Sequence, residues 1–505
     1  MHQDLIQSLK AIEFPLIDCL KKENYFIPAG WESAHNVGRW WEAALLTEAT
    51  TGMKIPDDIS LLMTMHIRAL SANSLGMLLN DPELVSVSKL NEREIAKRYV
   101  ETYSVFAGYH LNYHNLREAM LAYASLVQYR ESHYARDAAE RLLDTIERRF
   151  LDKTITDSDV CNAIGLPAVE PSALSLKYEE YTQSAGRAME GIYRYWKASG
   201  SDRALRVLHK SAVLHRETVL CADGSVPLWL ADEGYKSGHN HSYLGTLRGL
   251  ALYAIEFGDK KLLESIYLTY KNVIPKYSCD YHGFTPHDLG CLLFPDENGD
   301  PLGDHASCAD AAYLAFLLAV YGGYTELLTD AERLLRRLFY VQNDNGAFGI
   351  FGGSYFGKGY TIDVFTSIAS TFCYLLRDLL QMREDGIYVH LHFSDKIPAA
   401  EVISERTDRQ YTRILPHEKA SLHIAVPAWC KEDMISVTFA DNTPIPYTIE
   451  GGYLHISKEN IVAEKEICVS YALLQRETIA KTWNSGQSFR VLWKGDSIIS
   501  TAKLE

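Results

Sequence analysis

Six loop-like stretches carry side chains whose types could do chemistry on a sugar. They are rich in His, Asp, Trp, Tyr and Gly, and they span residues 31–40, 108–115, 236–243, 280–290, 294–310 and 349–363. Aromatic faces stack on pyranose or furanose rings, whereas His and Asp side chains hydrogen-bond to hydroxyls. Cleavage of a glycosidic bond usually needs two carboxyl groups, one protonated and one ionised. The loops supply seven candidates: Asp288, Asp296, Glu297, Asp300, Asp304, Asp310 and Asp363.

A repeated helical segment could bring these loops together. Segments with apolar residues at helical spacing begin near Gly38, Leu116, Gly186, Gly245, Ala309 and Thr366. Their starts lie roughly 55 to 80 residues apart, more than the roughly 34 to 47 residues of open helical repeats, so each unit has spare length for a loop. Five of the six polar loops directly precede such a segment. We therefore predict an (α/α)6 toroid of six helical hairpins, with the loops at one mouth.

The hydrophobic pattern changes after Asp385. Ile387, Val389, Leu391 and Phe393 alternate with polar or aromatic residues, and similar short alternating runs follow to the end of the chain. Such runs, separated by Pro, Gly, Asn and Asp turns, are typical of an antiparallel β-sandwich. The fold class predicted is thus mainly α with a β domain. We place the helical domain at residues 1–384 and the sandwich, packed directly on it, at residues 385–505.

Composition narrows the classes of partner. The chain has 505 residues and a formal net charge of −15, which argues against a nucleic acid or an anionic membrane as partner. Its nine cysteines are scattered without CxxC pairs, so neither a disulfide framework nor a zinc ribbon is indicated. The first 25 residues carry acidic groups within an amphipathic pattern, and no stretch approaches 18 apolar residues. We expect a cytoplasmic protein.

Four motifs together resemble a known enzyme family. They are YHNL at 113–116 before EAMLAYASL, SGHNHS at 237–242 before a helix, ASCA at 306–309, and IYVHL at 387–391. In this order they resemble motifs of the β-L-arabinofuranosidase-like glycoside hydrolases, family 127 and its relatives, over nearly the whole chain. The resemblance implies an (α/α)6 toroid followed by a β-sandwich, and a sugar as substrate.

The chemistry departs from that family. Its characterised members hold zinc with a Glu and a Cys of a Glu-x-Cys motif and with an adjacent Cys pair, one of which is the nucleophile. Here the Glu position is Ala306, and the Cys pair aligns near Asp363 and Val364. Cys308 alone cannot make a tetrahedral site that normally needs three or four ligands, so we interpret it as a buried structural cysteine. We predict a mechanism without metal or cofactor.

The alignment suggests roles for three carboxyl groups. Asp288 lies at about the place of the family's acid/base Glu and is our candidate general acid. Asp363 lies near the missing nucleophile, and the helix start that follows would stabilise its ionised form. Asp304 is the reserve candidate. Two alternatives stay open: Asp363 could be an N-cap for a helix starting near Phe365, and Asp296 and Asp300 could be turn residues.

Other side chains are candidates for binding the sugar. The set is His35, Arg39, His114, His239, His241, Tyr355 and Tyr360. In an extended loop only one of His239 and His241 would face the pocket, and we prefer His239 because the family pattern matches it. The two tyrosines belong to the Gly-rich segment 349–363, which suits a sugar-covering loop better than a phosphate-binding one.

These observations favour a glycoside hydrolase-like enzyme. It would cleave a small oligosaccharide or glycoside with two carboxyl groups, and the resemblance implies an arabinofuranoside-like substrate. One alternative is a sugar epimerase or isomerase of the (α/α)6 type, and another is a sugar-binding protein without activity. The partner expected is a carbohydrate, and edge strands of the sandwich could mediate a homodimer.

Overall fold

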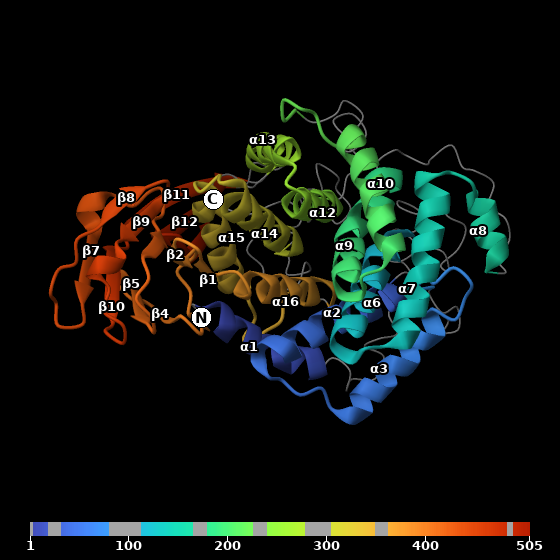
Figure 1. Ribbon diagram of the computed structural model, residues 1–505, viewed down its shortest axis with the longest axis horizontal. Helices are drawn as coiled ribbons and strands as arrows, with labels where there is room; N and C mark the ends of the chain where they lie inside the picture. Colours follow the sequence, from blue (N-terminus) through green and yellow to red (C-terminus); the bar gives the residue numbers. More distant parts are fainter. Residues whose placement is uncertain are drawn as a thin grey trace.

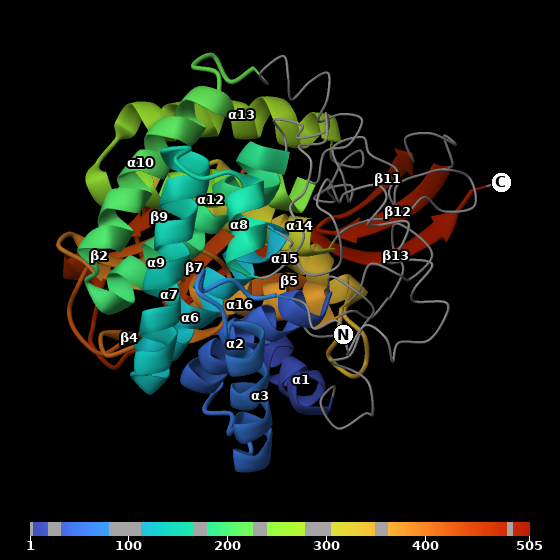
Figure 2. The same cartoon turned by 90° about the vertical axis from the view of Figure 1, so that its right-hand side faces the viewer.

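A computed structural model gives the fold. It describes residues 4–18, 32–79, 113–164, 179–225, 240–277, 305–348, 362–481 and 488–504. A helical part and a β part lie side by side along the long axis of the molecule (Figure 1). Figure 2 looks along that axis, with most of the helices in front of the strands.

Six inner helices form a closed ring within the described residues. They are α2 (Glu32–Thr51), α6 (Leu116–Arg130), α9 (Arg187–Ser199), α12 (Asn240–Phe257), α14 (His305–Gly322) and α16 (Ile362–Leu376). Each packs against the next in this order, and α16 packs against α2. The ring closes because the last inner helix returns to the first.

An outer helix covers each inner one. The pairs are α2 with α3 (Asp57–Leu70), α6 with α7 (His133–Ile146), α9 with α10 (Asp202–Thr218), α12 with α13 (Lys260–Tyr277) and α14 with α15 (Leu327–Val341). The sixth outer helix, α1 (Leu5–Asp18), packs on α16 and α2. Short elements complete this part: η1 (Tyr113–Asn115), the π-helical turns η2 (Glu147–Leu151) and η3 (Glu179–Gly186), and α8 (Asp157–Ala163). The predicted (α/α)6 toroid is confirmed.

The two rings of helices differ in how they are buried. In α14 every residue from His305 to Val320 is buried, because this helix touches neighbours on all sides. By contrast, α7 buries one stripe that includes Ala135, Ala139 and Leu142, at the spacing of an amphipathic helix. A charged residue on an inner helix therefore has to find its partner inside the ring.

Glycines let the inner helices approach closely. A Cβ built on Gly191 of α9 would lie 2.6 Å from the Cβ of Met120 in α6. A Cβ built on Gly249 of α12 would lie 2.6 Å from the Cβ of Met189 in α9. Both contacts involve atoms next to the backbone, which cannot rotate away. Glycine is therefore required at these two helix crossings.

The described residues of the β part form two five-stranded sheets and one three-stranded sheet. The first has the order β1 (Leu380–Arg383), β2 (Gly386–Val389), β6 (Leu422–Ala425), β9 (Tyr453–Ile456), β8 (Thr448–Glu450). The second has the order β3 (Asp395–Ile397), β4 (Ala400–Arg406), β5 (Arg409–Pro416), β10 (Ile467–Ala472), β7 (Ile435–Phe439). The third comprises β11 (Gln475–Lys481), β12 (Ser488–Lys494) and β13 (Ser497–Lys503), and short 3-10 turns span Glu432–Met434 and Lys458–Asn460.

Two details differ from the sequence prediction. Strands β2 and β6 pair in parallel, whereas all other strand pairs described are antiparallel. The strand β1 lies before residue 385 and joins the first sheet. This strand was not predicted from the sequence, because four residues are too few to show an alternating period. The boundary at 384/385 stays a prediction.

The β part packs directly on the helices. Val491, Trp493 and Ile498 of the three-stranded sheet belong to the same buried core as the toroid, while the two larger sheets enclose a core of their own. Between the parts, the Tyr340 hydroxyl of α15 lies 3.1 Å from the Thr501 hydroxyl of β13. No helix in the described ranges is long and apolar enough to cross a membrane.

Candidate active site

Side chains from the first two turns of the six inner helices meet inside the ring. The first turns contribute His35 (α2), Arg117 and Glu118 (α6), Arg187 (α9), His241 (α12) and Asp363 (α16), and the second turns contribute Arg39 (α2) and Asp310 (α14). These side chains contact one another across the ring. All six inner helices therefore point their N-terminal ends, which carry a partial positive charge, toward the same mouth.

Asp363 is the carboxylate at the centre of the predicted site. Its Oδ1 lies 2.7 Å from His35 Nε2 and 2.7 Å from Arg39 Nε. Burial alone would raise the pKa of Asp363, but the positive charges of Arg39 and His35 and the hydrogen bond from His35 hold this pKa well below its usual range. The side chain is 24% exposed, whereas its partners are 1–2% exposed. Asp363 is therefore an ionised carboxylate that a ligand in the ring could reach.

The N-cap interpretation of Asp363 is wrong. The helix begins at Ile362 and not near Phe365, so Asp363 lies in the first turn. The hydroxyl of Thr366 donates to the carbonyl of Ile362, 2.6 Å away, which holds this turn together. The helix start places the carboxylate where the dipole favours a negative charge, as expected for the ionised group.

His241 connects two sides of the ring. Its Nδ1 bonds to Asp310, and its Nε2 lies 2.5 Å from Arg39 NH2 and 2.9 Å from Arg117 NH1. Asp310 in turn pairs with Arg248 of α12. We had expected an extended loop in which His239, not His241, faces the pocket. Instead α12 begins at Asn240, and the helix directs His241 into the ring.

His114 and Glu118 extend the site onto α6 and its 3-10 turn. The His114 ring stacks on the His35 ring with 5.2 Å between centroids, and it contacts Arg187 NH1. Glu118 is fully buried and pairs with Arg187 at 2.6 Å and Arg39 at 3.2 Å. Burial would raise the pKa of Glu118, but Arg187, His35 and Arg39 lower it. Glu118 therefore holds two arginines and one histidine in place.

A second layer of polar groups lies deeper in the ring. Glu190 of α9 pairs with Arg248 at 2.8 Å and with Arg194 at 2.7 Å. Glu42 of α2 accepts a hydrogen bond from the Tyr374 hydroxyl at 2.7 Å. Burial and the nearby Glu190 raise the pKa of Glu42. This layer separates the mouth from the far end of the ring.

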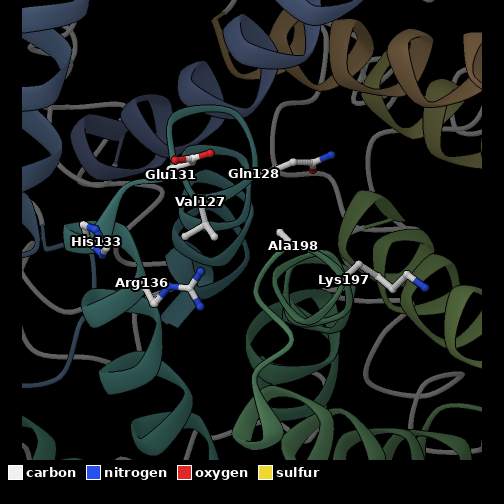
Figure 3. Close-up of a pocket in the computed structure, with 7 residues that line it drawn as sticks. All are labelled: Val127, Gln128, Glu131, His133, Arg136, Lys197 and Ala198. Atoms are coloured by element: carbon white, nitrogen blue, oxygen red, sulfur yellow. The ribbon is translucent and has the colours of Figure 1, made fainter.

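The far end carries a different pocket. It has a volume of about 580 Å³ and lies where α6 and α9 end and α7 begins. Its lining is Val127, Gln128, Glu131, His133, Arg136, Lys197 and Ala198 (Figure 3). None of the predicted site residues lies there, and Glu131 is its sole carboxyl group among the described lining residues.

Several predicted residues cannot be placed. Asp288, Asp304, His239, Tyr355 and Tyr360 lie outside the described residues. Their roles stay predictions. Cys308 and Ala306 are buried near the start of α14, and no group of three or more His, Cys, Asp or Glu side chains in the described ranges could hold a metal ion.

Sequence reasoning missed the buried ion pairs. Arg117, Glu118, Arg187, Glu190 and Arg248 lie within helices, where charged residues usually face solvent. The surrounding sequence does contain an indication of burial. In LREAMLAYASL and RAMEGIY the charged residues stand among apolar and small residues, and a solvent-exposed helix face would carry more polar side chains. Charged residues in such helices must be paired in the interior.

Three solved structures with a similar fold are described as glycoside hydrolases. A GH127 β-L-arabinofuranosidase from Geobacillus stearothermophilus T6 matches with a TM-score of 0.59 and 13% identity, covering 98% of this chain and 80% of that one. A second GH127 β-arabinofuranosidase matches with a TM-score of 0.62 and 12% identity, covering 97% and 82%. A third glycoside hydrolase has a TM-score of 0.56 and 12% identity, covering 93% and 77%. No family model and no curated protein matches. The resemblance to the family 127 fold is thus confirmed at the level of the fold.

Proposed function

We propose that the protein is a glycoside hydrolase-like enzyme that acts on a small oligosaccharide or glycoside at the mouth of the ring. The observation that supports this most is Asp363, an ionised and partly exposed carboxylate held by His35 and Arg39 where six helices begin. Proteins of similar fold are glycoside hydrolases, which is consistent with the proposal but concerns the fold alone.

Asp363 takes the role of the ionised group in this mechanism. The charge of Arg39 and the hydrogen bond from His35 keep it deprotonated, so it could attack the anomeric carbon or deprotonate a water that does. Asp288 is proposed as the acid that donates a proton to the leaving oxygen, with Asp304 in reserve. Water supplies a hydroxyl group to the anomeric carbon, and the alcohol leaves with the donated proton.

The histidines and tyrosines of the mouth are proposed to hold the sugar. His114 is 8% exposed and lies beside His35, where it could bond a hydroxyl group. His241 is 2% exposed and contacts two arginines, so it fits a role in orienting Arg39 better than direct contact. His239, Tyr355 and Tyr360 remain candidates for sugar contact.

A screen of aryl glycosides tests the proposal. Release of the aryl alcohol should occur for at least one glycoside, and Asp363→Asn should lower kcat/KM by about 10²–10⁴-fold, the usual contribution of such a group. Asp137→Asn is the matched control, because Asp137 is exposed on outer helix α7. The absence of hydrolysis on every glycoside, or equal activity of Asp363→Asn and Asp137→Asn, would refute the proposal.

A sugar epimerase or isomerase is the second candidate. It is favoured by the three histidines His35, His114 and His241 that meet at the mouth, since proton abstraction from carbon needs such bases. Against it, His241 Nε2 already faces two guanidinium groups. Incubation of free monosaccharides in deuterated water distinguishes the two: deuterium at carbon without glycoside cleavage would identify an epimerase.

A further inference from the structure

Among the described residues, arginines outnumber carboxylates in the layer where the inner helices begin. Arg39, Arg117 and Arg187 lie there with two carboxylates, Glu118 and Asp363. Asp310 also reaches this layer, but Arg248 engages its Oδ1 and His241 its Oδ2. Counted over these described side chains, the layer has one more arginine than free carboxylates, although the chain as a whole has a net charge of −15.

Arg117 is the arginine of this layer that makes no ion pair with a carboxylate of the described residues, although its charge acts to lower the pKa of Glu42, Glu118 and Glu190. It is 2% exposed, and no carboxylate oxygen of the described residues lies within 4.0 Å of its guanidinium. Its hydrogen bond is to His241 Nε2, at 2.9 Å. A buried charge normally has a partner of opposite sign, because leaving water without one costs several kcal/mol, on the order of that for breaking a buried ion pair.

The bond from Arg117 to His241 is also shared. Arg39 NH2 lies 2.5 Å from the same nitrogen. An imidazole nitrogen has one lone pair, so it accepts one good hydrogen bond and leaves the other guanidinium short of an acceptor. Arg117 belongs to α6 and His241 to α12, and in the ring α9 lies between these two helices. Because the two side chains nevertheless contact each other, the guanidinium of Arg117 lies inside the ring.

Neighbouring donors lack acceptors too. Arg117 Nε, Arg187 Nε and Asn115 Nδ2 are buried and have no hydrogen-bond partner in the structure. All three come from the starts of α6 and α9, where backbone N–H groups and the helix dipole also favour an anion. Glu118 Oε2 is the opposite case, an acceptor without a hydrogen bond, and it lies 3.7 Å from His35 Nδ1.

We propose that Arg117 forms part of a subsite for a carboxylate on the sugar, so that the ligand is a uronic acid or a uronide. A carboxylate is one negative charge with two acceptor oxygens, and it matches one guanidinium without an ion-pair partner among the described residues in both charge and geometry. Gly245 lies beside this group, since a Cβ there would be in ordinary contact with Arg117 NH1 at 3.5 Å. The inference rests on the proposed function only in that the ligand is a sugar.

Binding of free sugars tests the subsite without any need for turnover. Titration calorimetry would compare glucuronate with glucose and galacturonate with galactose. A charge-assisted hydrogen-bond pair predicts that the uronate binds about 10- to 100-fold more tightly than its neutral counterpart. The preference should weaken as salt is raised, and inorganic sulfate should compete with the uronate if the charge rather than the carboxylate shape is recognised.

Variants assign the preference to one residue. Arg117→Met should remove the preference for uronate, whereas Arg148→Met should keep it, because Arg148 is exposed on the outside of the molecule. Circular dichroism establishes that each variant is folded. If Arg117→Met does not fold, the comparison of uronate with neutral sugar in the parent protein still decides the question.

The outcomes separate this inference from the proposed function. Binding of uronates without hydrolysis of any glycoside would leave the subsite standing and refute the hydrolase. Hydrolysis of neutral glycosides, with no preference for uronate in binding, would support the hydrolase and refute the carboxylate subsite. Equal preference for uronate in the parent and in folded Arg117→Met would also overturn the assignment.

Discussion

The close crossing of α9 and α12 makes one substitution informative about the whole ring. In Gly249→Ala the new Cβ would lie 2.6 Å from the Cβ of Met189 and 3.0 Å from the backbone nitrogen of Glu190. These atoms are fixed to α9, so the two helices would have to separate. Overpacking of this kind costs about 1–3 kcal/mol. The gain in helix propensity from Gly to Ala, about 1 kcal/mol, offsets part of this cost.

Gly245→Ala is the matched control. It is the same change one turn earlier on α12, and there the nearest atoms to a new Cβ are Arg117 NH1 at 3.5 Å and the Cβ of Arg187 at 3.8 Å, which are ordinary contacts. The helix-propensity gain is common to both variants and cancels between them. Gly249→Ala should therefore be less stable than Gly245→Ala by about 1–3 kcal/mol.

Urea denaturation followed by circular dichroism gives the comparison. The midpoint for Gly245→Ala should equal or exceed that of the parent protein, and the midpoint for Gly249→Ala should be lower than that of Gly245→Ala. Equal midpoints for the two variants would refute the closely packed ring, because the crossing would then have room for a methyl group.

Three further predictions concern charge, protonation and metal. Burial lowers the pKa of His215 to about 3, so below about pH 6.5 the imidazole takes up a proton in the unfolded state but not in the folded state. The free energy of unfolding should therefore fall by about 1.4 kcal/mol for each pH unit below about 6.5 through this group. His215→Leu should reduce the slope of the free energy of unfolding against pH by that amount. Arg39→Met removes the cation beside Asp363, so the pKa of Asp363 should rise. The acidic limb of the pH profile of kcat/KM should therefore move to higher pH. If the acidic limb stays at the same pH, a group other than Asp363 controls it. Because the resemblance to family 127 predicts Ala306 at the position of that family's zinc-binding Glu, we expect chelator treatment and Cys308→Ala to leave turnover unchanged, and loss of activity in either case would contradict the proposed metal-free mechanism.

Much of the fold could be predicted from the sequence because it repeats. Each inner helix has its own apolar run, and five of the six polar loops directly precede such a run, so the number of hairpins in the ring follows from the number of repeated segments. The strand β1 and the parallel pairing of β2 with β6 could not be predicted, since a four-residue strand has no measurable period and pairing direction depends on distant segments. The third sheet, which joins the core of the helical part, depends on a contact with α15 that no local pattern encodes.

The candidate site was predictable in part for the same reason. His35, Arg39, His114, His241 and Asp363 come from four of the polar stretches, and the structure brings all five side chains together at the mouth. Their positions follow from the shared helix starts.

The buried ion pairs were not predictable from residue type. The side chains of Glu118 and Arg187 are fully buried, and their partnership depends on which helices are neighbours in the ring. The preference for His239 over His241 rested on an assumed extended loop, and the start of α12 at Asn240 removed that premise.

A structure of the Asp363→Asn variant with an unhydrolysed glycoside tests the central claim most directly. The account predicts that the sugar lies at the N-terminal mouth of the ring, with its anomeric carbon about 3–3.5 Å from the side chain at position 363, as a reacting pair requires. A sugar bound instead in the pocket between the ends of α6 and α9, or away from the ring altogether, would contradict it.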